Sequence, residues 1–164
     1  MTDNRPYRPN VGIMLLNKNK SKVWVGSRID YPNTPTQEYW QMPQGGVDEG
    51  EYIEKAMWRE LQEETSISQK HAEIIDCHKD WIKYDLPSDL SSKLWNGQFK
   101  GQKQKWFLLK LTSEDSVINI NTENPEFSDW KWTDIESLVK NIVPFKKEIY
   151  QQVIKDFDKH LIFY

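Results

Sequence analysis

The sequence predicts a single α/β domain in which helices cover the faces of a mixed β-sheet. Strand-like segments outnumber helix-like segments without strict alternation, which favours a mixed sheet over an all-parallel one. No linker or low-complexity tract divides the chain, so residues 1–164 are expected to form one domain. Hydrophobic residues make up 37% of the chain and include eight tryptophans, which predicts an aromatic-rich core inside a polar surface.

The first part of the chain is expected to contain a hairpin, a loop and a helix. Residues 11–17 and 22–29 are β-rich runs separated by the polar segment NKNKSK, so they are predicted to be neighbouring strands. Residues 30–39 carry two prolines and several turn formers, which is typical of an exposed loop. Residues 40–46, WQMPQGG, should form a short extended segment, and a helix should follow over residues 53–64.

The second part is expected to add strands and a closing helix. Residues 104–111 form a strongly apolar run, as in a central strand. In the tail from residue 144 to 163, apolar residues recur at helical spacing, so this segment should pack back on the sheet. The other predicted elements are a long strand region at 72–86, a helical turn at 88–95 and strands at 114–120 and 129–134.

Charge and cysteine content exclude several classes of protein. The net charge of -3 argues against a protein that holds long nucleic acid on a basic surface, so no DNA partner is expected. The single cysteine, Cys77, excludes an internal disulfide, and the first residues lack a signal-peptide pattern; both favour the cytoplasm. No window approaches the roughly 18 uncharged apolar residues of a membrane span. The three histidines have no partner at metal-ligand spacing.

The predicted helix at 53–64 carries carboxylates inside its apolar stripe. At about 100° per residue, Glu60 and Glu64 fall within the core-facing stripe and Glu63 falls at its edge. Like charges at this spacing repel, and partial burial raises their cost further. The stripe itself consists of Ala56, Met57 and Leu61.

A positive partner must therefore offset the charge of these carboxylates. Arg59 can neutralise one of them, but a single guanidinium cannot serve three. Oxygen ligands without histidine or thiolate favour magnesium, with manganese as a substitute. The alternative is a solvated acidic face, and the angular position of the glutamates argues against it. Gly45, Gly46 and Gly50 precede the helix; alone they would indicate a plain turn, but beside these acids they indicate part of a ligand site.

Residues 45–67, GGVDEGEYIEKAMWRELQEETSI, resemble the Nudix box, a signature of glycine, glutamate and a helical Arg-Glu-apolar-x-Glu-Glu segment at fixed spacings. Ser66 stands where the family has a glycine that closes the helix in a left-handed conformation. A serine there should cost on the order of 1 kcal/mol or shift the helix end. The matching positions are Gly45, Glu51, Arg59, Glu60, Leu61, Glu63, Glu64 and Ile67.

The resemblance covers nearly the whole chain. Segments 7–17, 40–51, 81–87, 101–111 and 125–132 are similar to the subgroup that contains bacterial RNA pyrophosphohydrolases and asymmetrically cleaving diadenosine tetraphosphate hydrolases. This similarity implies an α/β/α sandwich around a mixed sheet. It also implies attack of water on a phosphoanhydride with the help of divalent metal.

The resemblance further assigns roles to individual residues. It implies that Arg59 orients one of the box glutamates, and that Glu126, in the segment NPEF, joins the site as metal ligand, general base or both. Glu60 is the rival candidate for the base, and an ordinary loop acid is the alternative for Glu126. The implied metal site consists of Gly45, Glu60, Glu63, Glu64 and Glu126.

Six further residues are candidates for substrate contact. Arg28 and Phe145 resemble positions where RNA-cleaving members hold the base next to the terminal nucleotide. For the lysines of this set the alternative is plain solvation, and for the aromatic residues it is core packing. The candidates for phosphate contact are Arg8, Arg28, Lys103 and Lys105, and the candidates for base stacking are Tyr84 and Phe145.

The sequence thus predicts a metal-dependent pyrophosphohydrolase acting on dinucleoside polyphosphates, on the 5'-triphosphate end of RNA, or on both. WQMPQGG with the long preceding loop leans toward the dinucleotide-cleaving members. A monomer is expected. Two alternatives stay open: a catalytically silent module that only binds nucleotides or RNA, and a purely structural domain that does not respond to metal.

Overall fold

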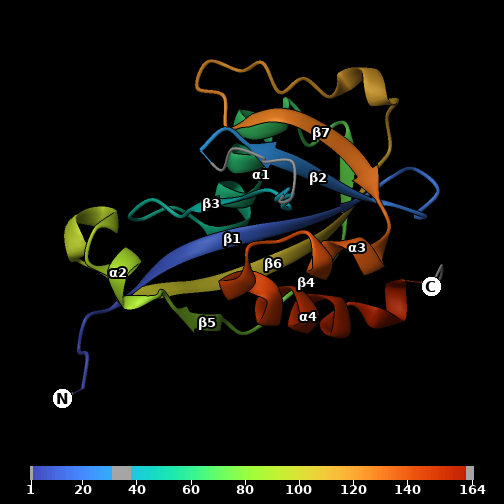
Figure 1. Ribbon diagram of the computed structural model, residues 1–164. Helices are drawn as coiled ribbons and strands as arrows, with labels where there is room; N and C mark the ends of the chain where they lie inside the picture. The colour runs from blue at the N-terminus through green and yellow to red at the C-terminus, as the bar shows by residue number, and fades with distance from the viewer. Residues whose placement is uncertain (1, 31–37, 162–164) are drawn as a thin grey trace.

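The computed structural model describes residues 2–30 and 38–161, and within these ranges seven strands form one mixed sheet (Figure 1). The strand order is β4-β6-β1-β2-β7, while β3 pairs with β1 and β5 pairs with β6. Only β1 and β6 run parallel among these pairs. The strands are β1 (Tyr7–Leu16), β2 (Val23–Arg28), β3 (Gln44–Gly46), β4 (Ala72–Cys77), β5 (Ile82–Asp85), β6 (Gly101–Leu111) and β7 (Phe127–Thr133).

Helices cover both faces of the sheet and make three layers. On one face, α1 (Ile53–Thr65) packs through Ala56, Met57 and Leu61. On the other face lie α3 (Ile135–Lys140) and α4 (Lys147–Asp156). A short helix, α2 (Ser88–Ser91), precedes β6. The structure confirms the predicted α/β/α arrangement, and no described helix has the length and apolar character needed to cross a membrane.

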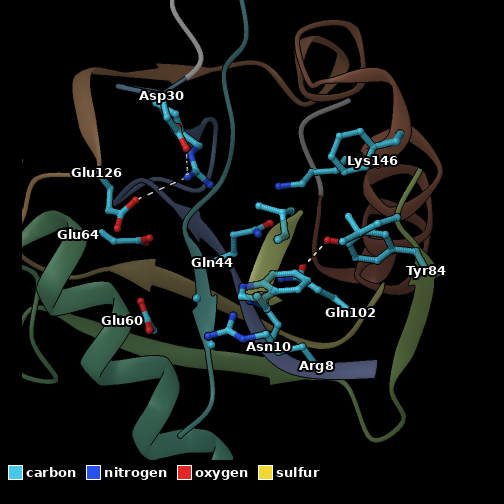
Figure 2. A pocket seen from close by; sticks show the side chains of 17 residues that line it. Arg8, Asn10, Asp30, Gln44, Glu60, Glu64, Tyr84, Gln102, Glu126 and Lys146 are labelled. Atoms are coloured by element: carbon cyan, nitrogen blue, oxygen red, sulfur yellow. Dashed lines mark hydrogen bonds and ion pairs between the residues drawn. The ribbon is translucent and has the colours of Figure 1, made fainter. Parts of the chain in front are cut away.

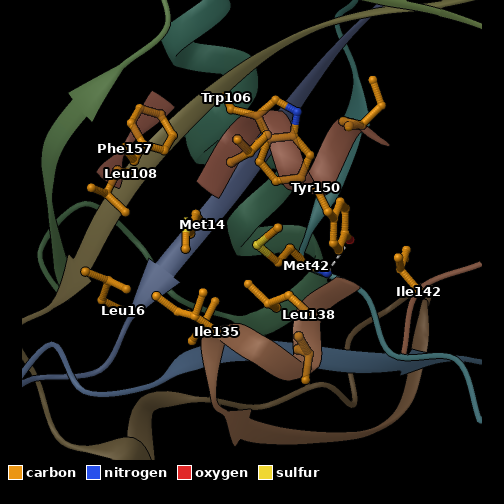
Figure 3. Packing of buried hydrophobic residues seen from close by; sticks show 14 of the residues in the cluster. Met14, Leu16, Met42, Trp106, Leu108, Ile135, Leu138, Ile142, Tyr150 and Phe157 are labelled. Atoms are coloured by element: carbon orange, nitrogen blue, oxygen red, sulfur yellow. Dashed lines mark hydrogen bonds between the residues drawn. The ribbon is translucent and has the colours of Figure 1, made fainter. Parts of the chain in front are cut away.

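The central strands β1 and β6 are buried on both faces because each face meets a helical layer. In β1, Val11, Ile13 and Leu15 join the core under α1, whereas Met14 and Leu16 join the core under α3 and α4. Figure 3 shows the second core, in which Met14, Met42, Trp106, Leu138 and Tyr150 pack together. This alternation fixes which β6 side chains face each layer, and so which of them can reach the site.

The predicted hairpin at 11–17 and 22–29 is confirmed, since β1 and β2 pair antiparallel next to their connecting loop. The predicted strand region at 72–86 is two strands that pair with different parts of β6. The predicted loop at 30–39 falls mostly on residues 31–37, which lie outside the described residues. The predicted closing helix is α4, flanked by 3-10 turns at Pro144–Lys146 and Asp158–His160.

The predicted strand at 114–120 is wrong. Asp115–Val117 forms a 3-10 turn instead. The amides of Val117 and Ile118 donate to Glu114 and Asp115 carbonyls within the segment, so they do not join a strand ladder. Both side chains still pack against the core under α1, which explains the apolar pattern.

Ser66 closes α1 where the sequence indicated a possible shift of the helix end. Its φ of 68° is left-handed, and its amide donates to the Gln62 carbonyl at 2.9 Å, so the helix ends without a shift. The Ser66 hydroxyl also donates to the Asn119 carbonyl at 2.7 Å. This hydrogen bond offsets part of the cost of placing a serine in a left-handed conformation.

Candidate active site

A pocket of about 410 Å³ opens where α1, β1, β3 and β6 meet, and it contains most of the predicted site residues. We call it the glutamate pocket, after Glu60, Glu64 and Glu126 in its lining. Figure 2 shows Glu60, Glu64 and Glu126 along one side and Tyr84 and Lys146 on the opposite side. The pocket is lined by Arg8, Asn10, Arg28, Asp30, Gln44, Gly45, Gly46, Glu60, Glu64, Tyr84, Leu86, Leu94, Trp95, Gln102, Glu126, Phe145 and Lys146.

Gly45 lets β3 pass directly over the Glu60 side chain of α1. A Cβ atom at this position would lie 1.9 Å from Glu60 Cδ and 2.0 Å from Oε2, which is closer than any side chain allows. Only a glycine at position 45 therefore lets the β3 backbone come this close to the Glu60 carboxylate. This contact agrees with the predicted place of Gly45 beside the glutamates.

Arg59 ties the acidic helix to the loop before it. Its guanidinium donates to Glu51 from Nε at 2.8 Å and from Nη2 at 2.9 Å, and to the Gly46 carbonyl at 2.8 Å. It also donates to Glu60 Oε1 at 2.9 Å and lies 3.3 Å from Glu63 Oε2. The sequence predicted that Arg59 orients one glutamate, and the structure shows it in contact with three.

Glu64 is a buried carboxylate and Glu60 is a partly buried one, in keeping with the partial burial that their place in the apolar stripe predicted. Burial raises the pKa of Glu60 to about 7, although Arg59 opposes the shift. Glu64 is only 4% exposed, and its pKa is raised well above the usual value by burial and then by the nearby charges of Glu60 and Glu126. Its Oε2 atom has no hydrogen-bond partner among the described residues. Glu63, in contrast, is mostly exposed and does not line the pocket.

Glu126 and Arg28 meet at the mouth of the pocket. Arg28 Nη2 lies 3.9 Å from Glu126 Oε2, while the same guanidinium makes two hydrogen bonds to Asp30, at 2.7 and 2.5 Å. The Glu126 backbone carbonyl accepts from the Ile29 amide at 3.0 Å, which fixes this loop to the end of β2. Glu126 therefore reaches the glutamate side of the pocket from a distant segment.

The predicted base-stacking residues lie together. The rings of Tyr84 and Phe145 have centroids 6.5 Å apart, and the Tyr84 hydroxyl donates to the Gln102 side chain. Both rings also pack partly against the core under α4, as the alternative of core packing expected, and their role in base stacking stays a prediction. Arg8 lies at another edge, with its guanidinium 5.1 Å from the centroid of the Trp95 ring.

Lys103 and Lys105 do not line this pocket. Successive β6 side chains point to opposite faces, and Gln102 is the one that faces the pocket. The Nζ atoms of Lys103 and Lys105 instead lie 4.7 and 5.0 Å from the centroid of the Trp81 ring. Their predicted contact with phosphate in the glutamate pocket is therefore not supported by their position.

The residues of the pocket fit a hard divalent cation. Glu60, Glu64 and Glu126 supply oxygen ligands only, and the buried Oε2 of Glu64 calls for a positive partner. Within residues 2–30 and 38–161, no three carboxylate, imidazole or thiol groups lie close enough together to enclose an ion as they stand.

A family model described as "NUDIX domain" matches residues 6–153. The chain belongs to the Nudix family. Its relatives include an RNA pyrophosphohydrolase from Roseobacter denitrificans, 50% identical over 156 residues that cover 95% of this chain and 94% of the relative. Another RNA pyrophosphohydrolase, from Wolbachia pipientis subsp. Culex pipiens, is 47% identical over 158 residues, or 96% and 93% of the two chains.

Solved structures support the fold. A C. elegans Ap4A hydrolase in a binary complex superposes with a TM-score of 0.62 at 18% identity and covers 92% of this chain and 98% of that one. The E. coli dihydroneopterin triphosphate pyrophosphohydrolase superposes with a TM-score of 0.67 at 21% identity, covering 93% and 99%.

The sequence did not predict two features of this Nudix pocket. Lys146, beside Phe145, is only 5% exposed, and burial followed by the charge of Arg28 lowers its pKa to about 7. Gln104 Nε2 donates to Asn10 Oδ1 at 2.9 Å in a buried network below the pocket. The alternation of glutamine and lysine in GQKQK was the available signal for the network, whereas nothing local marks Lys146 as buried.

Proposed function

We propose that this Nudix protein is a metal-dependent pyrophosphohydrolase that removes pyrophosphate from the 5'-triphosphate end of RNA and also cleaves dinucleoside polyphosphates. The buried Glu64 carboxylate is the observation that supports this function most strongly. One of its oxygens has no hydrogen-bond partner among the described residues, and it faces a pocket that also holds arginine and lysine side chains. The names of the relatives favour the RNA end as the first substrate.

Magnesium is the proposed cofactor, with manganese as a substitute, because all the candidate side-chain ligands are carboxylates. Glu60, Glu63, Glu64, Glu126 and the backbone of Gly45 would hold it. A divalent metal bound there neutralises charge on the phosphate oxygens and makes water a better nucleophile. Arg59 keeps the carboxylates in position through its contacts with Glu51 and the Gly46 carbonyl.

The cationic and aromatic residues of the pocket would place the substrate. Arg8, Arg28 and Lys146 supply positive charge around the pocket, which suits a chain of phosphates. Tyr84 and Phe145 offer ring surfaces on which a base can stack. Glu126 and Glu60 are the two candidates to accept the proton of the attacking water, since both line the glutamate side of the pocket.

A silent module that only binds nucleotides or RNA is the competing function. The retention of all the box glutamates favours the enzyme, because binding alone does not require Glu60, Glu63 and Glu64 together. We also propose a monomer in the cytoplasm with no DNA partner, in keeping with the lone Cys77 and the net charge of -3.

Product analysis tests the proposed function. The purified protein is incubated with 5'-triphosphorylated RNA, diadenosine tetraphosphate and diadenosine pentaphosphate, with magnesium or with a chelator. Magnesium-dependent release of pyrophosphate from the RNA, with a measurable kcat/KM for the dinucleotides, is expected. Binding of these compounds without any turnover in magnesium or manganese would support the silent module instead.

A further inference from the structure

A second groove adjoins the glutamate pocket and shares Arg8 with it. This groove, of about 480 Å³, lies between the start of α1 and the segments that carry Trp81 and Phe99. Because Arg8 lines both spaces, the groove is a neighbour of the first pocket and lies within reach of a chain-like ligand held at the glutamates. Its lining residues are Arg8, Pro9, Val47, Asp48, Glu49, Gly50, Glu51, Ile53, Trp81 and Phe99.

Aromatic rings connect the two spaces. Phe99 packs edge to face against Trp95, with ring centroids 5.9 Å apart, and Trp95 lines the glutamate pocket with Arg8 over its ring. Trp81 lies in the second groove, and both Trp81 and Phe99 are only partly buried. Ring surfaces are thus available from the first pocket into the second groove.

Positive charge accompanies these rings. The Lys103 and Lys105 ammonium groups lie over the Trp81 ring, and within the described residues neither has a carboxylate partner within 4.0 Å. Three acidic residues, Asp48, Glu49 and Glu51, also line the groove. Glu51 accepts two hydrogen bonds from Arg59, and Asp48 lies 3.7 Å from the same guanidinium. The Trp81 side of the groove therefore combines stacking surface with two lysine ammonium groups.

We propose that this groove, lined by Trp81 and Phe99 and flanked at Trp81 by Lys103 and Lys105, binds the nucleotides that follow the 5' end of a single-stranded RNA substrate. Aromatic side chains that stack bases and cations that contact phosphates are the usual elements of a single-strand site. The inference rests on the proposed function, because the RNA end must first be held in the glutamate pocket. A dinucleoside polyphosphate has one nucleoside at each end of its phosphates and no phosphodiester-linked chain, so it cannot place successive nucleotides along the groove.

The test compares substrates that share the same 5' end. A triphosphorylated dinucleotide and a longer single-stranded RNA beginning with the same two nucleotides are hydrolysed in magnesium, with diadenosine tetraphosphate as a third substrate. Wild-type protein is expected to show a higher kcat/KM for the longer RNA. Trp81→Ala should lower that value by about fivefold or more, as expected for the loss of one base stack, and leave the two short substrates unchanged.

A salt titration tests the lysines separately. The longer RNA is prepared with a non-hydrolysable triphosphate, and its Kd is measured at several salt concentrations. The double variant Lys103→Gln, Lys105→Gln should reduce the slope of log Kd against log salt by about 0.7 for each phosphate that the lysines neutralise in the wild type. Lys110→Gln is the matched control, because Lys110 lies on the same strand but pairs with Glu73.

The outcomes separate the groove from the activity. Equal kcat/KM for short and long RNA in the wild type, or an equal loss on all three substrates in Trp81→Ala, would overturn the RNA groove and leave the pyrophosphohydrolase intact. An unchanged salt slope in the double lysine variant would also count against the groove. If the wild type hydrolyses none of the three substrates, the proposed function itself fails.

Discussion

Arg59 and Glu51 form a bidentate ion pair, with Arg59 Nε 2.8 Å from Glu51 Oε2 and Arg59 Nη2 2.9 Å from Glu51 Oε1. Glu51 stands before α1 and Arg59 lies within it, so the pair joins the loop to the middle of the acidic helix. Hydrogen bonding from Arg59 lowers the pKa of Glu51, which keeps the pair charged. The other donors of the same guanidinium reach Glu60 and the Gly46 carbonyl.

Glu51→Gln should therefore reduce activity although Glu51 does not line the glutamate pocket. Loss of the bidentate pair frees Arg59 to move toward Glu60 and Glu63. Changes to residues that hold metal ligands in place cost about 10- to 100-fold in metal affinity or activity. Magnesium titration of the reaction rate should show a higher metal requirement. Glu54→Gln, an exposed acid in the first turn of α1, should behave like the wild type.

Glu64→Gln should abolish turnover and leave the fold intact. The change removes a buried charge together with a proposed metal ligand, so the metal-free variant should be at least as stable to urea as the wild type. Turnover and the urea midpoint are measured on the same preparation, with the exposed Glu136→Gln as control. Retention of more than about a tenth of the wild-type rate would contradict the role given to Glu64.

Gly45→Ala should cost far more in activity than in stability. The new Cβ would meet the end of the flexible Glu60 side chain, which can turn away at little cost but then leaves its place in the pocket. Displacement of a reacting group by about 1 Å can lower a rate about 100-fold. In a Glu60→Ala background the same glycine change should have little further effect, and independent, additive losses would show that Gly45 acts elsewhere.

Lys146→Met should stabilise the protein most at low pH. Because the pKa of Lys146 is about 7 when folded and near its usual 10.5 when unfolded, the unfolded state binds more protons between these values. The loss of folding stability caused by burying the charged Lys146 is therefore at its full value below pH 7, and it disappears as the pH rises toward 10.5. Urea unfolding at pH 6 should show a gain of at least about 1 kcal/mol for the variant.

The same variant should show little gain near pH 10, where the folded lysine has already lost its proton. Lys147→Met, which changes the adjacent and partly exposed lysine, is the control and should leave the pH dependence as it is. A stability gain in Lys146→Met that is equal at both pH values would mean that the methionine merely packs better.

Most of the fold and the acidic part of the site could be predicted from the sequence, because both depend on local spacing. The positions of Glu60 and Glu64 on a helical wheel place them in the core-facing stripe, and the structure shows Glu64 buried and Glu60 partly buried. The predicted strand at 114–120 failed because Val117 and Ile118 reach the core from a turn, and an apolar pattern alone does not distinguish the two.

The cationic part of the site was harder to predict because it depends on tertiary packing. Lys103 and Lys105 were expected beside the phosphates, but the pleat of β6 turns them to the Trp81 side and leaves Gln102 at the pocket. Lys146, in the 3-10 turn before α4, becomes buried through tertiary packing that brings its ammonium group to 3.5 Å from Gln41 Oε1. No spacing rule carries that information, since the two segments are distant in sequence.

The most direct test of the central claim is anomalous diffraction from crystals grown with manganese and a non-hydrolysable triphosphorylated RNA. If Glu64 and the partly buried Glu60 together hold a divalent metal, an anomalous peak is expected within ligand distance of their carboxylates, and it should disappear in Glu64→Gln. A map without a peak beside these two residues, in crystals where the RNA end is well ordered in the pocket, would contradict the account.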